Sequence, residues 1–221
     1  MQLTIASAQR EFGRVSIGNT KMPGSTFAVS ATKCNVGGKL AKLPGSTCHH
    51  CYALKLEKLR PSVAQGWSAN YMKATKLIET RPEQWAAAMA FQIRRLGEKT
   101  GEKFHRWFDG GDLASLAMLR AIVRTAELTP EFKHWLPTRE TVVVKAYRQQ
   151  FGAFPSNLVV RVSSPMINDK PIAGHVNTST VHRKGSTHVG LACEARSRGN
   201  QCGPCRACWD PAVPNISYPL H

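Results

Sequence analysis

The seven cysteines of this 221-residue chain fall into two groups near opposite ends, and no other feature constrains the fold as strongly. We call Cys34, Cys48 and Cys51 the N-terminal cysteine group. The C-terminal cysteine group consists of Cys193, Cys202, Cys205 and Cys208. Because a Cys-x-x-Cys pair can turn both sulfurs toward one centre, each group predicts a metal site.

The two groups differ in how completely they could surround a metal. Three thiolates leave one iron of a [4Fe–4S] cluster without a protein ligand, which is what binding of a substrate or cofactor requires. With His49 or His50 as a fourth ligand, the N-terminal cysteine group could instead close around a structural zinc ion. The four C-terminal thiolates could hold a second [4Fe–4S] cluster or zinc, and their C-x2-C-x2-C run favours the cluster. The groups could also meet in space and share one centre, with one cysteine left over.

Short apolar runs alternate with amphipathic stretches along the chain, which predicts parallel β/α units. The expected strands lie at 26–32, 104–108, 132–136, 157–163, 188–192 and 215–218, and the expected helices at 62–79, 82–96, 113–123 and 141–151. The polar region 164–187 is expected to form a long loop or an irregular crossover. This pattern predicts an α/β fold, a partial (β/α)6-like barrel of mostly parallel strands with a Cys-rich C-terminal segment. We expect the barrel at residues 1–192 and a cluster-binding segment at 193–221.

A Gly-Gly turn follows the strand expected at 104–108. Gly110 and Gly111 expose backbone groups that could bind an amino-acid moiety, and Asp109 or Asp112 could pair with its ammonium group. Asp112 could equally be an ordinary cap of the next helix. Arg139 also follows an expected strand, so the carboxyl edge of the sheet is the predicted site.

Two arginines lie within expected strands. Alternation sends Arg106 and Phe108 to one face of the sheet and Trp107 to the other. Because an unpaired buried charge is costly, Arg106 and Arg161 each predict an anionic partner, either a cofactor group or an aspartate of the sheet.

The formal net charge of +16 favours polyanions as partners, and nucleic acid is the usual one. Solubility, or neutralisation of thiolates, accounts for the same charge. The chain has neither a signal-like apolar start nor a run of eighteen apolar residues. We therefore expect no membrane association and a reducing cytoplasmic location.

The motifs together resemble the bacteriophage gene-product-88 family. The resemblance rests on PGSTCHHCYA around Cys48 and Cys51, FHRWFDGGD from Phe104, the strand ending at Arg139, and CGPCRACW from Cys202. It implies a phage protein acting in the host cell cytoplasm.

A looser likeness links the chain to radical S-adenosylmethionine (SAM) enzymes. This likeness implies that the N-terminal cysteine group holds a [4Fe–4S] cluster, that His50 is the aromatic residue before the last cysteine, and that Gly110, Gly111 and Asp112 contact the SAM amino group. The chain departs from that pattern in its C-x13-C spacing and in Asp112, where those enzymes have glutamate.

Three functions follow as hypotheses. The first is a radical-SAM-like iron–sulfur protein acting on a nucleic acid or nucleotide. The second is a non-enzymatic zinc protein that binds nucleic acid or a host protein. The third is an iron–sulfur protein whose cluster is structural or redox-sensing, without SAM chemistry.

Overall fold

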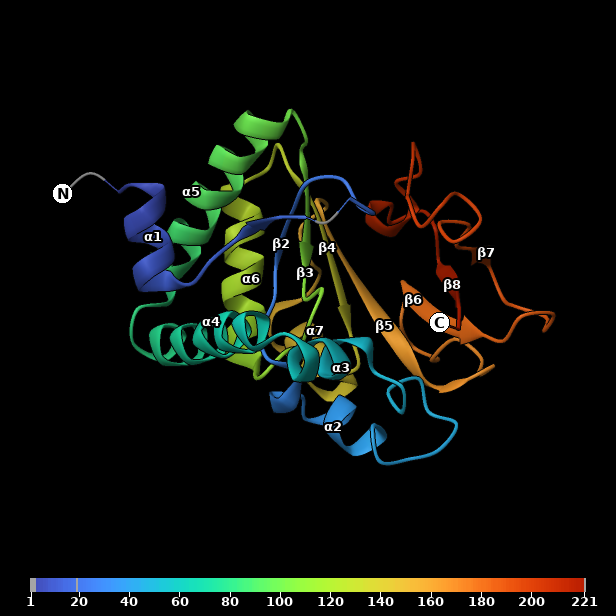
Figure 1. Ribbon diagram of the computed structural model, residues 1–221. Helices are drawn as coiled ribbons and strands as arrows, with labels where there is room; N and C mark the ends of the chain where they lie inside the picture. Colours follow the sequence, from blue (N-terminus) through green and yellow to red (C-terminus); the bar gives the residue numbers. More distant parts are fainter. Residues whose placement is uncertain (1–2, 19, 221) are drawn as a thin grey trace.

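The computed structural model describes residues 3–18 and 20–220, and its centre is a single eight-stranded sheet (Figure 1). The strands are β1 (Ser16–Ile17), β2 (Ser25–Phe27), β3 (Phe104–Trp107), β4 (Lys133–Thr138), β5 (Leu158–Ile167), β6 (Thr178–His182), β7 (Leu191–Ala192) and β8 (Asn215–Pro219). Their order in the sheet is β1-β2-β3-β4-β5-β6-β8-β7. Only the β1–β2 pair is antiparallel among these strands. The α/β class and the mostly parallel sheet are confirmed, but the sheet is open at β1 and β7 and does not close into a barrel.

Seven α-helices surround this sheet in the described part of the chain. They are α1 (Ile5–Phe12), α2 (Val36–Leu40), α3 (Tyr52–Leu59), α4 (Pro61–Thr80), α5 (Pro82–Thr100), α6 (Leu116–Leu128) and α7 (Thr141–Phe151), with 3-10 turns η1 (Ala31–Lys33) and η2 (Ala207–Trp209). Pro61 and Pro82 occupy first helical positions, where a missing N–H costs nothing. The helices expected at 62–79, 82–96 and 141–151 are therefore confirmed.

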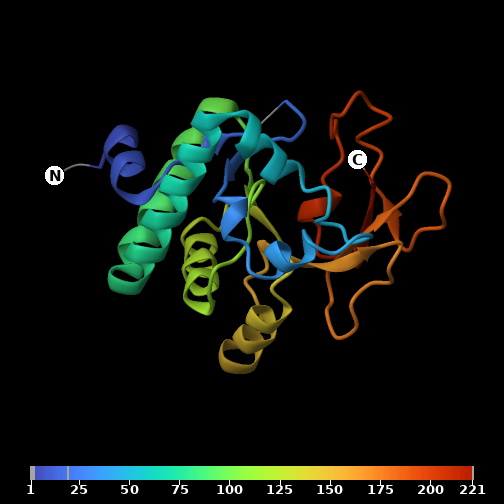
Figure 2. The same cartoon turned by 60° about the horizontal axis from the view of Figure 1, so that its bottom comes forward.

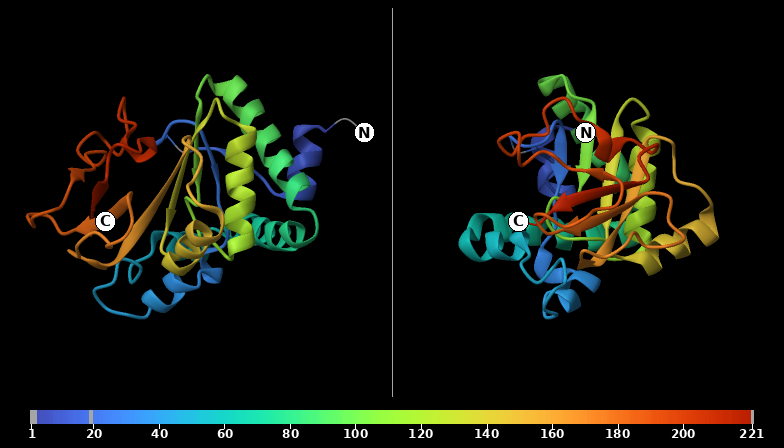
Figure 3. Two further views of the ribbon diagram at one scale, coloured as in Figure 1. Left: turned by 180° about the vertical axis from the view of Figure 1, so that it is seen from behind. Right: turned by 90° about the vertical axis from the view of Figure 1, so that its right-hand side faces the viewer.

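The sheet separates two apolar layers (Figures 1 and 3). On one face, α4 to α7 pack on β2 to β5 around fully buried side chains such as Trp85, Trp107 and Leu136. On the other face lies the C-terminal segment, where Trp209 packs with Trp135 and Met22. This second layer places the C-terminal cysteine group against the sheet.

Several details differ from the sequence predictions. The region 164–187 is not a long loop, because β5 continues to Ile167 and β6 forms within it. Asp112 does not cap the next helix; Ser115 does, by accepting from the Met118 N–H. Arg106 and Trp107 lie on opposite faces as expected, but Phe108 joins the Trp107 side because its φ of 55° interrupts the alternation.

Two buried histidines are expected to make the stability of the protein depend on pH. Burial lowers the pKa of His134 to about 3 and holds the pKa of His105 well below its ordinary value. The unfolded chain therefore binds protons below pH ~6.5 that the folded chain does not, so stability is lost as the pH falls. We expect the free energy of unfolding to drop by about 1.4 kcal/mol per pH unit for each histidine below pH ~6.

Urea unfolding at several pH values measures this slope. His134→Asn should reduce this slope by the contribution of one histidine, even if the variant also changes the free energy of unfolding itself. An unchanged slope in that variant would show that His134 titrates normally.

Candidate functional site

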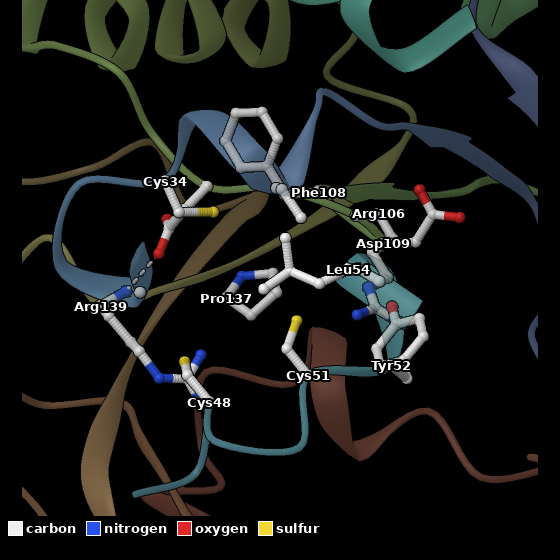
Figure 4. Close-up of a pocket in the computed structure, with 16 residues that line it drawn as sticks. Cys34, Cys48, Cys51, Tyr52, Leu54, Arg106, Phe108, Asp109, Pro137 and Arg139 are labelled. Atoms are coloured by element: carbon white, nitrogen blue, oxygen red, sulfur yellow. Dashed lines mark hydrogen bonds between the residues drawn. The ribbon is translucent and has the colours of Figure 1, made fainter. Parts of the chain in front are cut away.

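A cavity of about 130 Å³ opens at the carboxyl edge of the parallel strands, and all three cysteines of the N-terminal group line it (Figure 4). Its wall comes from η1, α2, α3, the turn after β3 and the end of β4. The residues beside the cysteines are Ala31, Gly37, Tyr52, Ala53, Leu54, Arg106, Phe108, Asp109, Gly110, Gly111, Asp112, Pro137 and Arg139. The site expected at this edge is thus assembled from segments over 100 residues apart in the sequence.

The unusual C-x13-C spacing has a structural reason. Cys34 directly follows η1, and α2 with its following loop lies between it and Cys48. Cys48 and Cys51 share a tight turn in which the Cys51 N–H donates to the Cys48 carbonyl at 3.1 Å. Thr47 ties this turn to the sheet, because its N–H donates to the Pro165 carbonyl at 2.8 Å. The inserted helix therefore does not prevent the three thiols from reaching one cavity.

The thiols sit in a buried setting, and the guanidinium of Arg139 lies near two of them. Burial raises the pKa of Cys34 to about 12, and the neighbouring Asp112 carboxylate adds to this rise. Burial also raises the pKa of Cys48, and the positive charge of Arg139 opposes this effect. The Arg139 guanidinium is held in place because Nη2 and Nε donate to Thr47 Oγ1 at 2.7 and 3.1 Å.

Gly37 keeps the space between two of the sulfurs open. A Cβ on this buried glycine would lie 3.7 Å from both Cys34 Sγ and Cys48 Sγ. The neighbouring His49 and His50 are exposed, pack ring against ring at 4.6 Å, and lie outside the lining of the cavity.

The glycines and aspartate of the Gly-Gly turn are held by neighbouring protein groups. Gly111 has a φ of 82°, and a Cβ there would lie 2.4 Å from the Val29 carbonyl oxygen. A Cβ on Gly110 would lie 2.5 Å from the Trp67 ring. Both positions require glycine for packing, since any side chain would displace a backbone or an indole.

The Asp112 carboxylate is fully engaged inside the protein. Oδ1 accepts from the Thr138 hydroxyl at 2.6 Å and from the Leu113 N–H at 2.8 Å, and Oδ2 accepts from the Arg139 N–H at 2.9 Å. These bonds fasten the turn after β3 to the end of β4. Asp112 therefore shapes the cavity wall.

Asp109, unlike Asp112, has a carboxylate oxygen that accepts no hydrogen bond from the described residues. Its Oδ1 is buried and has no hydrogen-bond partner in the part of the chain that the structure describes. Burial raises the pKa of Asp109, and the neighbouring Arg106 opposes this rise. Arg106 Nε is likewise buried without a partner among the described residues, while the guanidinium stacks 4.6 Å from the Trp135 ring. The sequence named Asp109 only as an alternative, because a motif does not reveal which carboxylate is already bonded.

The four cysteines of the C-terminal group gather on the opposite face of the sheet. Burial raises the pKa of Cys202, and the nearby thiols Cys193 and Cys205 add to the rise. Burial raises the pKa of Cys208 to about 11, and its Sγ lies 3.2 Å from Tyr218 Oη.

Arg161 fastens this segment to the sheet but forms no ion pair with any described residue, contrary to the sequence prediction. The fully buried guanidinium donates instead to backbone carbonyls. The four shortest of these bonds, at 2.8–3.1 Å, go to Ala207, Cys208, Asp210 and Val213.

Two features are absent from the described residues. Within residues 3–18 and 20–220, no three His, Cys, Asp or Glu side chains form a group that could hold a metal ion. In the same part of the chain, no helix has the length and apolarity needed to cross a bilayer.

Fold and site together define an α/β protein with a thiol-lined cavity at the carboxyl edge of an open parallel sheet. The family model described as "Gene product 88" matches residues 15–211, and the chain belongs to this family. The match spans both cysteine groups and confirms the resemblance to the bacteriophage gene-product-88 family. No curated protein and no solved structure matches the chain.

Proposed function

We propose that this phage-family protein is an iron–sulfur protein that holds a [4Fe–4S] cluster on Cys34, Cys48 and Cys51, in a radical-SAM-like arrangement. The observation that carries the proposal is that these three thiols line one cavity at the carboxyl edge of parallel strands. The lining includes no histidine, so the protein offers three ligands for a cubane and leaves one iron open.

The surroundings of the thiols fit an anionic cluster. Gly37 leaves the space between Cys34 and Cys48 clear, where a side chain would compete with a bound group. Arg139 places a fixed positive charge beside Cys48, and this charge offsets part of the negative charge of bound thiolates. The parallel strands β2, β3, β4, β5, β6 and β8 also lie side by side, which is the arrangement from which a partial barrel is built.

The cavity also fits the amino-acid end of SAM. Bound at an open iron, SAM would supply hydrogen-atom abstraction from a substrate. The ammonium group of SAM needs an acceptor, and Asp109 Oδ1 has no partner among the described residues, whereas both oxygens of Asp112 already accept hydrogen bonds. Arg106 Nε is the corresponding free donor for the carboxylate. We assign these roles to Asp109 and Arg106, with Asp112 and Arg139 holding the wall.

We further propose a second [4Fe–4S] cluster on Cys193, Cys202, Cys205 and Cys208. Four thiolates close such a cluster without an open iron, which suits a structural or electron-transfer role. Trp209 and Tyr218 pack beside this group and limit access of water.

Metal analysis of protein purified without oxygen tests the proposal. About eight irons and eight sulfides per chain, with a broad band near ~400 nm, would support two clusters, and about four of each would support one. Zinc without iron would contradict it. Equilibrium dialysis of the reduced protein then tests SAM binding. Asp109→Asn should weaken that binding at least tenfold, whereas Asp169→Asn, an exposed loop residue, should leave it unchanged.

A further inference from the structure

The surface around the mouth of the cavity is rich in positive charge, which the Glu140 carboxylate near Lys39 offsets only in part. Residues 31–60, which form η1, α2, α3 and the loop between the two helices, carry six exposed basic side chains: Lys33, Lys39, Lys42, Lys55, Lys58 and Arg60. We call these six the basic surface. The segment contains a single acidic residue, Glu57, and its buried carboxylate accepts from the Ser30 hydroxyl at 2.9 Å and the Ala31 N–H at 2.6 Å. No carboxylate of the segment therefore faces solvent beside these cations.

The six basic side chains of the segment form no ion pair with any described residue. The seven ion pairs in the described part of the chain are all made by arginines outside this segment. None of the six basic side chains takes part in them. A cation-rich surface without internal partners attracts a polyanion.

Geometry joins the basic surface to the cavity. Both α2 and α3 pack against η1, and all three contribute lining residues: Ala31, Gly37 and Tyr52 among them. Figure 2 brings this end of the molecule forward, where α2 and α3 both lie close to η1. A polyanion bound here would therefore lie across the opening that leads to the cysteines.

Exposed aromatic rings lie among the positive charges at the opening of the cavity. Tyr52 lines the cavity, yet it is 52% exposed, and its buried hydroxyl lies near Arg106. His49 and His50 present two further exposed rings on the adjoining loop. Phosphate-binding cations interleaved with exposed aromatic rings are typical of proteins that bind single-stranded nucleic acid, because unpaired bases stack on the rings.

We infer that the basic surface binds single-stranded nucleic acid, with phosphates along its lysines and one unpaired base stacked on Tyr52 at the cavity mouth. A duplex could satisfy the lysines but not Tyr52, since its bases are already stacked. An acidic protein would likewise offer charge without a base. The inference does not depend on the cluster, because every residue it uses lies on the protein surface.

Fluorescence anisotropy with a labelled oligonucleotide of about 16 nucleotides tests the inference. The protein should bind single strands more tightly than the matching duplex, with an affinity that falls steeply as salt is raised. The triple variant Lys39→Gln, Lys42→Gln and Lys58→Gln should bind at least tenfold more weakly. Losing three phosphate contacts should also lower the salt slope by about 2.

Lysines at the opposite edge of the sheet supply a control with the same change in charge. Lys99, Lys103 and Lys133 are exposed near the amino ends of β3 and β4, and replacing all three by glutamine should change the affinity less than about twofold. Equal losses of affinity in the two triple variants would show that only the net charge of the protein matters, and would overturn the inference.

Tyr52 separates base stacking from charge. Tyr52→Ala should weaken binding of single strands about tenfold, leave the salt slope unchanged, and be rescued by Tyr52→Phe. The inference is overturned if the duplex or poly-glutamate binds as tightly as the single strand, or if Tyr52→Ala has no effect. Iron content is measured on the same samples, so a failure here is distinguishable from a failure of the cluster proposal.

Discussion

Cys48→Ala is expected to remove about four of eight irons per chain and to leave the remaining cluster spectrum intact. Cys48 is buried in the cavity wall, and no neighbouring cysteine of that cavity can replace its sulfur, because Cys34 and Cys51 already ligate the same cluster in our proposal. The effect should therefore be loss of the whole N-terminal cluster. Iron and sulfide analysis, together with the absorbance near ~400 nm, measures it.

A matched variant in the other group provides the control. Cys202→Ala should remove the other half of the iron and leave SAM binding at the open site. Removal of all iron by either single variant would show that the two groups share one centre. Retention of all iron by Cys48→Ala would refute the N-terminal site. Circular dichroism should confirm that both variants remain folded.

Arg161→Met is expected to destabilise the protein by at least about 3–5 kcal/mol, or to release the C-terminal segment from the sheet. Methionine fills part of the space but donates no hydrogen bond, so four backbone carbonyls in the turn around η2 each lose one charged donor. Because four hydrogen bonds from one fully buried guanidinium are lost together, the cost is larger than that of a single surface bond. Urea unfolding measures the loss.

Arg124 is a suitable control for this variant. It forms two ion pairs, with Glu83 and Glu127, but all three side chains are largely exposed. Arg124→Met should therefore cost no more than about 1 kcal/mol. Limited proteolysis distinguishes local release from global unfolding, since release would expose cleavage sites between 193 and 214 while α4 to α7 stay resistant. Equal stability of the two variants would refute the role of Arg161.

The two proposed centres are linked through one side chain. Arg106 lies near Tyr52 and Asp109 on the cavity side and near Tyr218 and Cys208 on the other; burial opposes its charge, but interaction with the ionised forms of these four groups raises its pKa. Arg106 directly precedes Trp107 in β3, so its side chain points to the opposite face of the sheet, toward the C-terminal layer. Arg106 therefore lies between the cavity and the C-terminal cysteine group.

Much of this organisation is determined locally and could be read from the sequence. The spacing of the cysteines defined the two cysteine groups. Helices α4 and α5 begin at Pro61 and Pro82, residues that favour the first position of a helix. Short apolar runs predicted β3, β4 and β5, and burial alternates with period two only in β3, because β5 is buried along its first seven residues. The position of the site at the carboxyl edge followed from the order of strands and helices alone.

Only the tertiary structure decided which polar groups remain free. Asp109 and Asp112 are three residues apart in one motif, yet Asp112 is engaged by Thr138 and Arg139 at the end of β4, whereas one oxygen of Asp109 has no partner among the described residues. In the same way, Arg161 finds its acceptors about fifty residues further along the chain and needs no anion. Sequence determines which groups can donate and accept, but hydrogen bonds between distant segments are fixed only when the sheet brings those segments together.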